Sequence, residues 1–235
     1  MRSVMCGRYS LVCIDDLGNR FRVFNPMMGA RSRFNIAPGN EMPVIVGGDA
    51  RELVLMQWGL VPRFTCDLVS ARHPINARAE TIRENPVFRH LVRDRRCLVP
   101  ASGFYEWKNE GKRKVPFYFH LPESPLFAFA GLYDTWKTPD GSSLATYTII
   151  TCRPNPLIAG IHDRMPVILR KSDEKHWISQ ESLTAEIMES MLSPFPAEQM
   201  AACPVSPLVN SPGTDDERLV QPLNSSAGKQ TLLEE

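Results

Sequence analysis

The sequence lacks the long apolar segments that anchor proteins in membranes. No apolar run approaches the ~18 residues of a membrane-spanning helix. Charged residues interrupt the N-terminal region at Arg2, Arg8, Asp15 and Asp16, so it does not resemble a secretory signal. We therefore expect no membrane association and no secretion. The protein is expected to work in the bacterial cytoplasm near the nucleoid, or in the nucleus if its source is eukaryotic.

The spacings that bind metals and common cofactors are also absent. The six cysteines form no C-x-x-C pair and the five histidines form no H-x-x-x-H pair, so neither a zinc site nor a dithiol redox centre is indicated. The chain has no G-x-x-x-x-G-K-[ST], G-x-G-x-x-G or G-x-S-x-G motif. These absences argue against nucleotide-binding, dinucleotide-binding and serine-hydrolase sites. We expect neither a metal nor a cofactor.

Charge is nearly balanced over the chain but unevenly distributed along it. Residues 1–170 carry 23 Lys and Arg against 15 Asp and Glu, a net charge of +8, and residues 171–235 carry 4 against 11, a net charge of −7. The two values sum to the formal net charge of +1. A basic main body suits an anionic partner such as nucleic acid. An ordinary arginine-rich surface would give the same numbers, so this feature alone does not decide the function.

Strand patterns outnumber helical ones. Two hairpins are predicted, one from residues 42–46 and 53–58 and one from residues 103–108 and 116–121. Further strands are expected at 6–10, 33–39, 97–100, 126–134, 145–151, 167–169 and within 204–223. Short helices are expected at 13–24, 80–84, 86–93, 154–161, 172–178 and 183–192. The predicted fold class is α+β with a largely antiparallel core.

No linker divides the main body of the chain. Residues 5–223 are therefore expected to form one domain. Residues 224–235, which are rich in small and polar side chains and end in two glutamates, are expected to be a disordered tail.

The stretch from Met5 to Tyr9 offers a distinctive chemistry at Cys6. If Met5 starts the chain and is removed, Cys6 carries an α-amine and a thiol on adjacent carbons, with ordinary pKa values of about 8 and about 8.5. An aldehyde can form an imine with this amine, and the thiolate can then close a thiazolidine ring. An unpaired cysteine is more commonly a small buried apolar residue, here in a first strand. Position alone leaves both interpretations open.

Two further residues could move protons. Glu106 lies between Tyr105 and Trp107. Strand alternation would turn its side chain to solvent, whereas a desolvated pocket would raise its pKa and make it a general acid. His162 belongs to a compact titratable cluster with Asp163 and suits proton transfer near neutral pH. A structural His–Asp pair is equally compatible with this pattern.

Three arginines and one asparagine accompany these candidates. Asn76 stands in a loop among small residues, and Arg8, Arg78 and Arg164 each adjoin a candidate residue. Arginine beside a reactive group often binds a phosphate or a carboxylate. In a chain with 27 Lys and Arg, however, some such adjacency is inevitable.

Six motifs, taken together, resemble those of the SRAP family, which is named for SOS response-associated peptidases and known for shielding abasic sites in DNA. The resemblance runs from Met5 to about Leu223. In order, the motifs are Met5–Tyr9 (MCGRY), Phe34–Gly39 (FNIAPG), Trp58–Pro62 (WGLVP), Asn76–Thr81 (NARAET), Arg96–Trp107 (RCLVPASGFYEW) and Ile161–Leu169 (IHDRMPVIL).

The resemblance implies one SRAP domain with a barrel-like β core, short flanking helices and a basic groove for single-stranded DNA. It implies that Cys6 becomes covalently joined to an abasic deoxyribose and that Asn76 positions the N-terminus and the sugar. Glu106 is implied as the acid/base for ring opening and imine formation, and His162 as an aid to proton transfer and to reversal of the crosslink. The implied phosphate-binding residues are Arg8, Arg78 and Arg164, and the implied groove-lining residues are Asn35, Pro38, Trp58, Trp107 and Thr151. The product would be a thiazolidine crosslink made by a monomer during the DNA damage response.

This chain departs from the family at its start. Family members begin Met-Cys, whereas residues 1–4 precede Met5 here. We favour Met5 as the start, with residues 1–4 as a non-native or removed extension. The other route is self-cleavage, with Cys6 as nucleophile and His162 or Glu106 as base.

Two other functions stay open. One is a thiol peptidase acting on other proteins, although the sequence marks no oxyanion hole. The other is a noncovalent reader of damaged or modified DNA.

Overall fold

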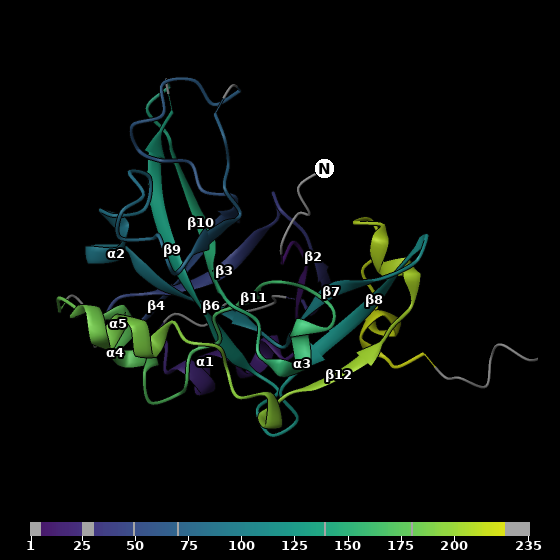
Figure 1. Cartoon of the computed structure of the whole chain (residues 1–235). Coiled ribbons are helices and arrows are strands. Elements are labelled where there is room, and N and C mark those ends of the chain that lie inside the picture. The colour runs from purple at the N-terminus through teal and green to yellow at the C-terminus, as the bar shows by residue number, and fades with distance from the viewer. Residues whose placement is uncertain are drawn as a thin grey trace, which may run out of the picture.

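The centre of the molecule is a closed five-stranded barrel (Figure 1). The computed structural model describes residues 6–24, 31–48, 50–69, 71–138, 140–179 and 181–223. The barrel strands are β3 (Glu41–Val46), β4 (Glu52–Trp58), β6 (Arg96–Ala101), β9 (Phe127–Lys137) and β10 (Ser143–Cys152). Pairing runs β10-β4-β3-β6-β9 and closes from β9 back to β10. Of these pairs only β4–β10 is parallel, so the expected α+β class with a barrel-like antiparallel core is confirmed.

Two glycines make the barrel geometry possible. Gly47 follows β3 in the β3–β4 hairpin with φ of +87°, and a Cβ there would lie 2.2 Å from the carbonyl oxygen of Ala50. Gly131 lies on β9, which pairs with both β6 and β10. A Cβ there would lie 2.8 Å from the Cys97 sulfur and 3.2 Å from the Thr148 carbonyl oxygen. The missing side chain therefore allows β9 to approach both neighbours.

A second sheet of five strands packs against the barrel. Its order is β12 (Ala201–Pro204), β8 (Arg113–His120), β7 (Gly103–Glu110), β1 (Tyr9–Leu11) and β2 (Arg33–Ile36). The predicted hairpin of β7 and β8 is confirmed. We call the apolar contact between sheet and barrel the aromatic junction, formed by Tyr9, Trp58, Phe104, Phe129 and Tyr147.

The C-terminal segment covers the opposite face of this sheet. Val205, Val209 and Leu219 pack with Tyr105 and Tyr118 in a separate buried cluster. The segment contains the 3₁₀ helices η3 (Pro207–Asn210) and η4 (Glu217–Val220), drawn in yellow in Figure 1. The strand expected within 204–223 lies earlier, at β12. Both faces of β7 are therefore covered by protein.

Two short strands extend the barrel sheet at the end of β10. β5 (Asn76–Arg78) pairs in parallel with the end of β10, with Asn76 opposite Ile149 and Arg78 opposite Thr151. β11 (Met165–Pro166) pairs with the same end, with Pro166 also opposite Thr151. The strand expected at 167–169 is thus shifted to β11. These additions bring three distant segments together at the end of β10.

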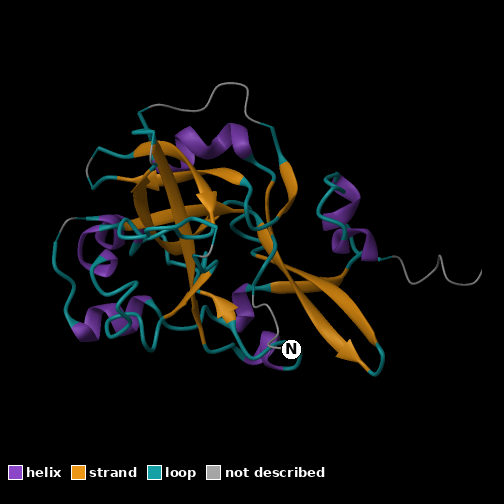
Figure 2. Ribbon diagram, turned by 90° about the horizontal axis from the view of Figure 1, so that it is seen from above, coloured by secondary structure: helices purple, strands orange, loops and turns teal. Residues whose placement is uncertain are grey.

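Short helices lie outside the strands (Figure 2). They are η1 (Ile14–Asp16), α1 (Leu17–Phe21), α2 (Leu91–Asp94), α3 (Pro156–Ala159), α4 (Glu174–Ile178), α5 (Ala185–Met191) and η2 (Ala197–Gln199). The helix expected at 80–84 is wrong, and the helix expected at 86–93 is present only at its end, as α2, because the residues before α2 form successive turns. Asn85 precedes a proline, and its side chain accepts a hydrogen bond from the Val87 nitrogen in a local turn.

No helix among the described residues is long and apolar enough to cross a membrane. The predicted extension 1–4 and tail 224–235 lie outside the described residues.

Candidate active site

The pairing of β1 with β7 brings Cys6 beside Glu106. Tyr9 lies opposite Phe104, and the Tyr105 nitrogen donates to the Arg8 carbonyl at 3.0 Å. Just beyond this strand pairing, the backbone nitrogen of Cys6 donates a hydrogen bond to Oε1 of Glu106 at 2.7 Å. Cys6 is 4% exposed and Glu106 is 1% exposed. The reactive nitrogen of the aminothiol hypothesis therefore meets a buried carboxyl group.

Glu106 occupies the face of β7 that looks toward the barrel. It lies two residues after Phe104 and so shares its side of the strand. Burial raises the pKa of the Glu106 carboxyl above its ordinary value, and nearby His162 and the hydrogen bond from Cys6 oppose part of the shift. The solvent-facing interpretation of Glu106 is wrong, because neither face of β7 is open to water here. A carboxyl group with a raised pKa is suited to exchange protons near neutral pH.

His162 completes this buried group. It follows α3, whose Asn155 side chain caps the helix by accepting from the Ile158 nitrogen. Nε2 of His162 lies 3.9 Å from Oε2 of Glu106, and Nδ1 accepts from the Arg164 nitrogen at 3.1 Å. That bond leaves the proton of the neutral ring on Nε2, facing Glu106.

Asp163 offers His162 a competing arrangement. Oδ1 of Asp163 also lies 3.1 Å from Nδ1 of His162, and this contact requires a proton on Nδ1. The Asp163 side chain is mostly exposed, whereas the Arg164 nitrogen is fixed in the backbone. We therefore assign the backbone bond to the neutral ring.

Burial also controls the Cys6 thiol. It raises the pKa of the thiol well above its ordinary value, Glu106 raises it further, and Arg164 opposes the shift. A thiol in this state is mostly protonated at neutral pH and is a weak nucleophile. It therefore needs a neighbouring group to accept its proton as it reacts.

Arg164 and Thr151 form a second group next to this one. The Arg164 guanidinium donates to both carboxylate oxygens of Glu80, at 2.6 and 2.8 Å, and to the Thr151 carbonyl at 2.6 Å. Hydrogen bonding to Arg164 lowers the pKa of Glu80. Arg78 lies opposite Thr151 on β5, on the same side of that strand as Asn76, and is exposed. Arg78 is therefore more open to a phosphate than the internally paired Arg164.

Arg8, Asn35 and Trp107 gather against the C-terminal segment. Nη1 of Arg8 donates to Asn35 Oδ1 at 2.8 Å and to the Val209 carbonyl at 2.6 Å. The Trp107 indole donates to Asn210 Oδ1 at 2.7 Å. Asn35 is fully buried, and its side-chain nitrogen donates to backbone carbonyls of the same segment. Sequence reasoning gave no sign that this segment holds three of the proposed DNA-binding residues.

Pro38 and Trp58 have contrasting positions. Pro38 is exposed in the turn that follows β2. Trp58 is 1% exposed, its indole nitrogen donates to the Ile75 carbonyl at 2.9 Å, and its ring packs against Tyr9 and Tyr147. No face of this ring is open for a base, so we assign Trp58 to the core.

Comparison with known proteins identifies the family. The sequence model of the family described as SOS response associated peptidase (SRAP) matches residues 5–212. The chain belongs to the SRAP family. The resemblance predicted from the six motifs is thereby confirmed.

SRAP relatives cover nearly the whole chain. The abasic site processing protein YoqW of Bacillus subtilis is 42% identical over 222 residues, which cover 92% of this chain and 99% of that protein. The abasic site processing protein HMCES of Gallus gallus is 30% identical, over 85% of this chain and 69% of that protein. An X-ray structure of a Bacteroides thetaiotaomicron protein has a TM-score of 0.85 at 30% identity and covers 93% of this chain and 100% of that one.

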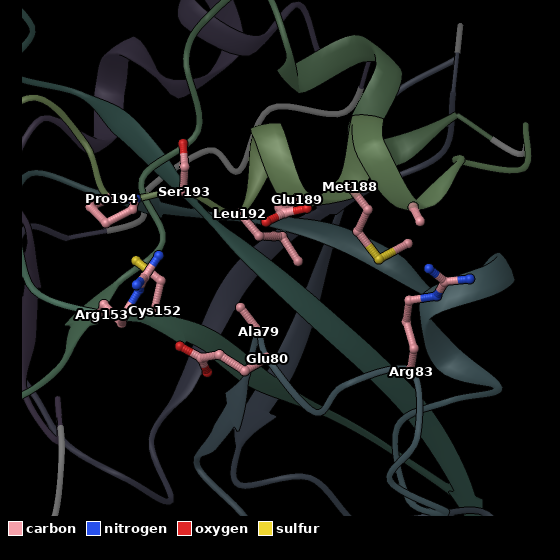
Figure 3. A pocket seen from close by; sticks show the side chains of 11 residues that line it. Ala79, Glu80, Arg83, Cys152, Arg153, Met188, Glu189, Leu192, Ser193 and Pro194 are labelled. Carbon is pink, nitrogen blue, oxygen red and sulfur yellow. The ribbon is translucent and has the colours of Figure 1, made fainter.

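A pocket of about 430 Å³ lies beside this SRAP site (Figure 3). Glu80 and Cys152 line it together with residues from α5 and the segment that follows. Sequence reasoning missed it, because its walls come from segments far apart in the chain. Among the described residues, no group of three or more His, Cys, Asp and Glu could hold a metal ion.

Proposed function

We propose that this chain recognises abasic sites in single-stranded DNA and becomes covalently joined to them through an N-terminal Cys6. The observation that carries the proposal is the 2.7 Å hydrogen bond from the Cys6 nitrogen to buried Glu106. Relatives named abasic site processing proteins support the choice of substrate. In this role the protein would act as a monomer that shields lesions during the DNA damage response.

The chemistry begins with the sugar. An abasic deoxyribose exists as a closed hemiacetal and an open aldehyde, and opening the ring needs proton transfer at the ring oxygen, a task for Glu106 or His162. Glu106 then takes a proton from the Cys6 ammonium group, and the free amine attacks the aldehyde carbon. Loss of one water gives the imine, with Glu106 returning the proton to the leaving hydroxyl.

Ring closure follows from the position of the thiol. The Cys6 sulfur adds to the imine carbon, the imine nitrogen gains a proton, and a five-membered thiazolidine results. Because burial raises the pKa of the thiol, Glu106 or His162 must accept the thiol proton during this step. Aldehyde and aminothiol thus combine with net loss of one water. Because the thiazolidine no longer contains an imine, the DNA strand is protected from β-elimination and breakage.

Backbone geometry supports self-cleavage as one route to the N-terminal Cys6. Cys6 has φ of +35°, near the left-handed region that residues other than glycine rarely adopt. This torsion is defined by the peptide bond to Met5 and disappears when that bond is cut. The thiol would attack the Met5 carbonyl, forming a thioester as the Cys6 nitrogen leaves with a proton, and water would hydrolyse the thioester. Synthesis from Met5 followed by methionine removal gives the same product.

DNA would be held by arginines on different elements around the site. Arg78 on β5 would contact a phosphate on one side, and the group of Arg8 and Trp107 would lie along the strand on the other. A thiol peptidase acting on other proteins would use only the Cys6 thiol, whereas the crosslink also uses the Cys6 nitrogen, which donates to Glu106. This contrast makes the crosslinking function the better match to the geometry.

Intact mass spectrometry tests the proposal. Protein with Cys6 exposed, mixed with a single-stranded oligonucleotide carrying one abasic site, should gain the oligonucleotide mass less one water, in an adduct stable to heat and detergent. Cys6→Ala should form no such adduct, and Cys66→Ala, a change at an exposed cysteine, should form it normally. Protein that retains Met1 and forms no adduct should become active when it is made to start at Met5.

Failure of the protein with Cys6 exposed would refute crosslinking. Binding to damaged DNA without an adduct, retained in Cys6→Ala, would then indicate a noncovalent reader. Cleavage of a peptide substrate that Cys6→Ser abolishes would indicate a peptidase.

A further inference from the structure

The pocket beside the site has the size and lining of a ligand site. One wall is formed by Ala79, Glu80 and Arg83, and the other by Met188 of α5 and by Leu192, which follows α5 (Figure 3). Its volume of about 430 Å³ falls in the ~300–1,000 Å³ range of small-molecule sites, which combine apolar walls with a few polar groups. Such a lining suits a flat heteroaromatic group with polar edges.

The pocket adjoins the Arg164 group of the proposed active site through Glu80. Glu80 lines the pocket and also binds Arg164, which in turn donates to Thr151. Cys152, the next residue of β10, lines the pocket as well. Neighbouring residues of one strand, Thr151 and Cys152, therefore contact the Arg164 group and the pocket.

Basic residues continue beyond the pocket. A smaller hollow of about 160 Å³ shares Arg83 and Met188 with the pocket and is also lined by Arg89, Arg93 and Arg96. Arg96 is buried and donates to backbone carbonyls, whereas the other three arginines are exposed. Exposed arginines that line one hollow suit the phosphates of a nucleic acid strand.

The pocket lining combines two arginines, Arg83 and Arg153, with two glutamates, Glu80 and Glu189. Glu80 is paired with Arg164, and Arg153 stands in the wall opposite Arg83. Glu189 is the other carboxylate of the lining, and as a hydrogen-bond acceptor it suits an exocyclic amine of a base.

We propose that the pocket receives a base of the DNA strand bound at Cys6, and that Arg83, Arg89 and Arg93 contact the phosphates beyond it. Met188 and Leu192 would cover the faces of the base, while Glu189 would accept from its edge. This subsite rests on the proposed function, and it would fix the register of the strand so that the abasic sugar reaches Cys6.

Equilibrium binding tests the subsite independently of the crosslink. The full chain with Cys6→Ala is titrated by fluorescence anisotropy with single strands that carry a stable tetrahydrofuran abasic analogue at the centre. In a series of strands, one further base is removed at each flanking position. Removal of the base that enters the pocket should weaken binding about tenfold, as expected for loss of the apolar contacts that bury one base, and removal of the others should change it less.

Pocket variants should abolish that dependence. Met188→Ala removes part of a wall, and Ala185→Phe fills the pocket from an exposed position of α5 that tolerates a larger side chain. In both variants, made in the Cys6→Ala protein, removal of the sensitive base should weaken binding less than twofold. Thermal melts followed by circular dichroism check that both variants are folded. One variant enlarges the pocket and the other fills it, so the two change its packing in opposite ways. Sensitivity that persists in folded forms of both variants would overturn the proposal.

The arginines are tested by salt dependence. Arg83→Gln and Arg89→Gln should each reduce the slope of log Kd against log salt by about one. Arg113→Gln, at the tip of the β7–β8 hairpin, should leave the slope unchanged.

The two proposals fail in distinguishable ways. A base scan with no sensitive position overturns the subsite even if protein with Cys6 exposed forms the adduct. Absence of the adduct together with a sensitive base overturns the crosslink and keeps the subsite.

Discussion

Two neighbouring parts of the contact between the second sheet and the barrel have opposite characters. The aromatic junction buries Tyr9 and Phe104 against rings of the barrel. Only two or three residues away on the same chain segments lies a second region, which we call the polar seam. It is formed by Cys6, Glu106, His162 and Arg164. One sheet thus carries an apolar anchor beside a group of buried polar and titratable side chains.

The difference shows how stability and chemistry are divided. Aromatic pairs add to the stability gained from burying apolar surface, whereas a buried carboxyl group is destabilising when ionised. The junction therefore holds strands β1 and β7 in a position that the seam alone would not maintain. Reactive groups need such support, because small errors in position reduce their effect.

The largest effect is expected from breaking the junction. Phe129 packs against both Tyr9 and Phe104, with ring centroids 5.9 and 6.0 Å apart. Phe129→Ala should lower the free energy of unfolding by about 3–5 kcal/mol, because it removes a buried ring and leaves a cavity. Denaturant titration measures this loss. Phe129→Leu, which keeps most of the volume, should lose much less, and a small loss in Phe129→Ala would show that the junction does not anchor the sheet.

A smaller change in the free energy of unfolding, of opposite sign, is expected from a substitution in the polar seam. Glu106→Gln keeps the acceptor for the Cys6 nitrogen but removes the charge. Because burial raises the pKa of Glu106 in the folded protein, the wild type is fully stable only below the unfolded-state pKa of about 4.3 and loses stability as pH rises through the folded-state pKa. The variant should therefore gain about 1 kcal/mol near pH 8 and nothing near pH 4.

The rate of adduct formation should fall in this variant, although its stability rises. The same Glu106→Gln variant should form the adduct about 10²–10⁴-fold more slowly, as expected for loss of an acid/base group. Unfolding measured at both pH values separates the two effects. A variant that is less stable than wild type at pH 8 would mean that the ionised carboxylate stabilises the seam.

Local sequence patterns predicted the parts of the fold that are continuous in the chain. The β3–β4 and β7–β8 hairpins each join neighbouring segments, so turn residues and alternation were sufficient to find them. Closure of the barrel was different, since β10 pairs in parallel with the distant β4. Nothing in the local pattern of either strand encodes that pairing, and only the family resemblance indicated a barrel.

Sequence reasoning likewise predicted only part of the site. Residue chemistry and the resemblance singled out Cys6, Glu106 and His162, which the structure brings together. Alternation misled for Glu106, because both faces of β7 are covered, and Trp58 was assigned to the groove although it belongs to the core. In each case the environment is set by segments remote in sequence, which no local pattern can supply.

The smallest effect on stability is expected at the edge of the seam. Arg78 is exposed, whereas Arg164 is held by Glu80 and Thr151, so only Arg78 can bind a phosphate without breaking an internal ion pair. Arg78→Gln should change the free energy of unfolding by less than about 0.5 kcal/mol. It should also weaken binding of an abasic single strand and reduce the slope of log Kd against log salt by about one.

Salt titrations of Arg78→Gln and Arg113→Gln, both made in Cys6→Ala protein, measure this difference without interference from the crosslink. Arg113→Gln should keep the full slope. An unchanged slope in Arg78→Gln would indicate that Arg164 binds the phosphate instead. Arg164 would then have to leave Glu80 when DNA binds. In that case the internal ion pair, and not an exposed side chain, would set the electrostatic cost of binding the strand.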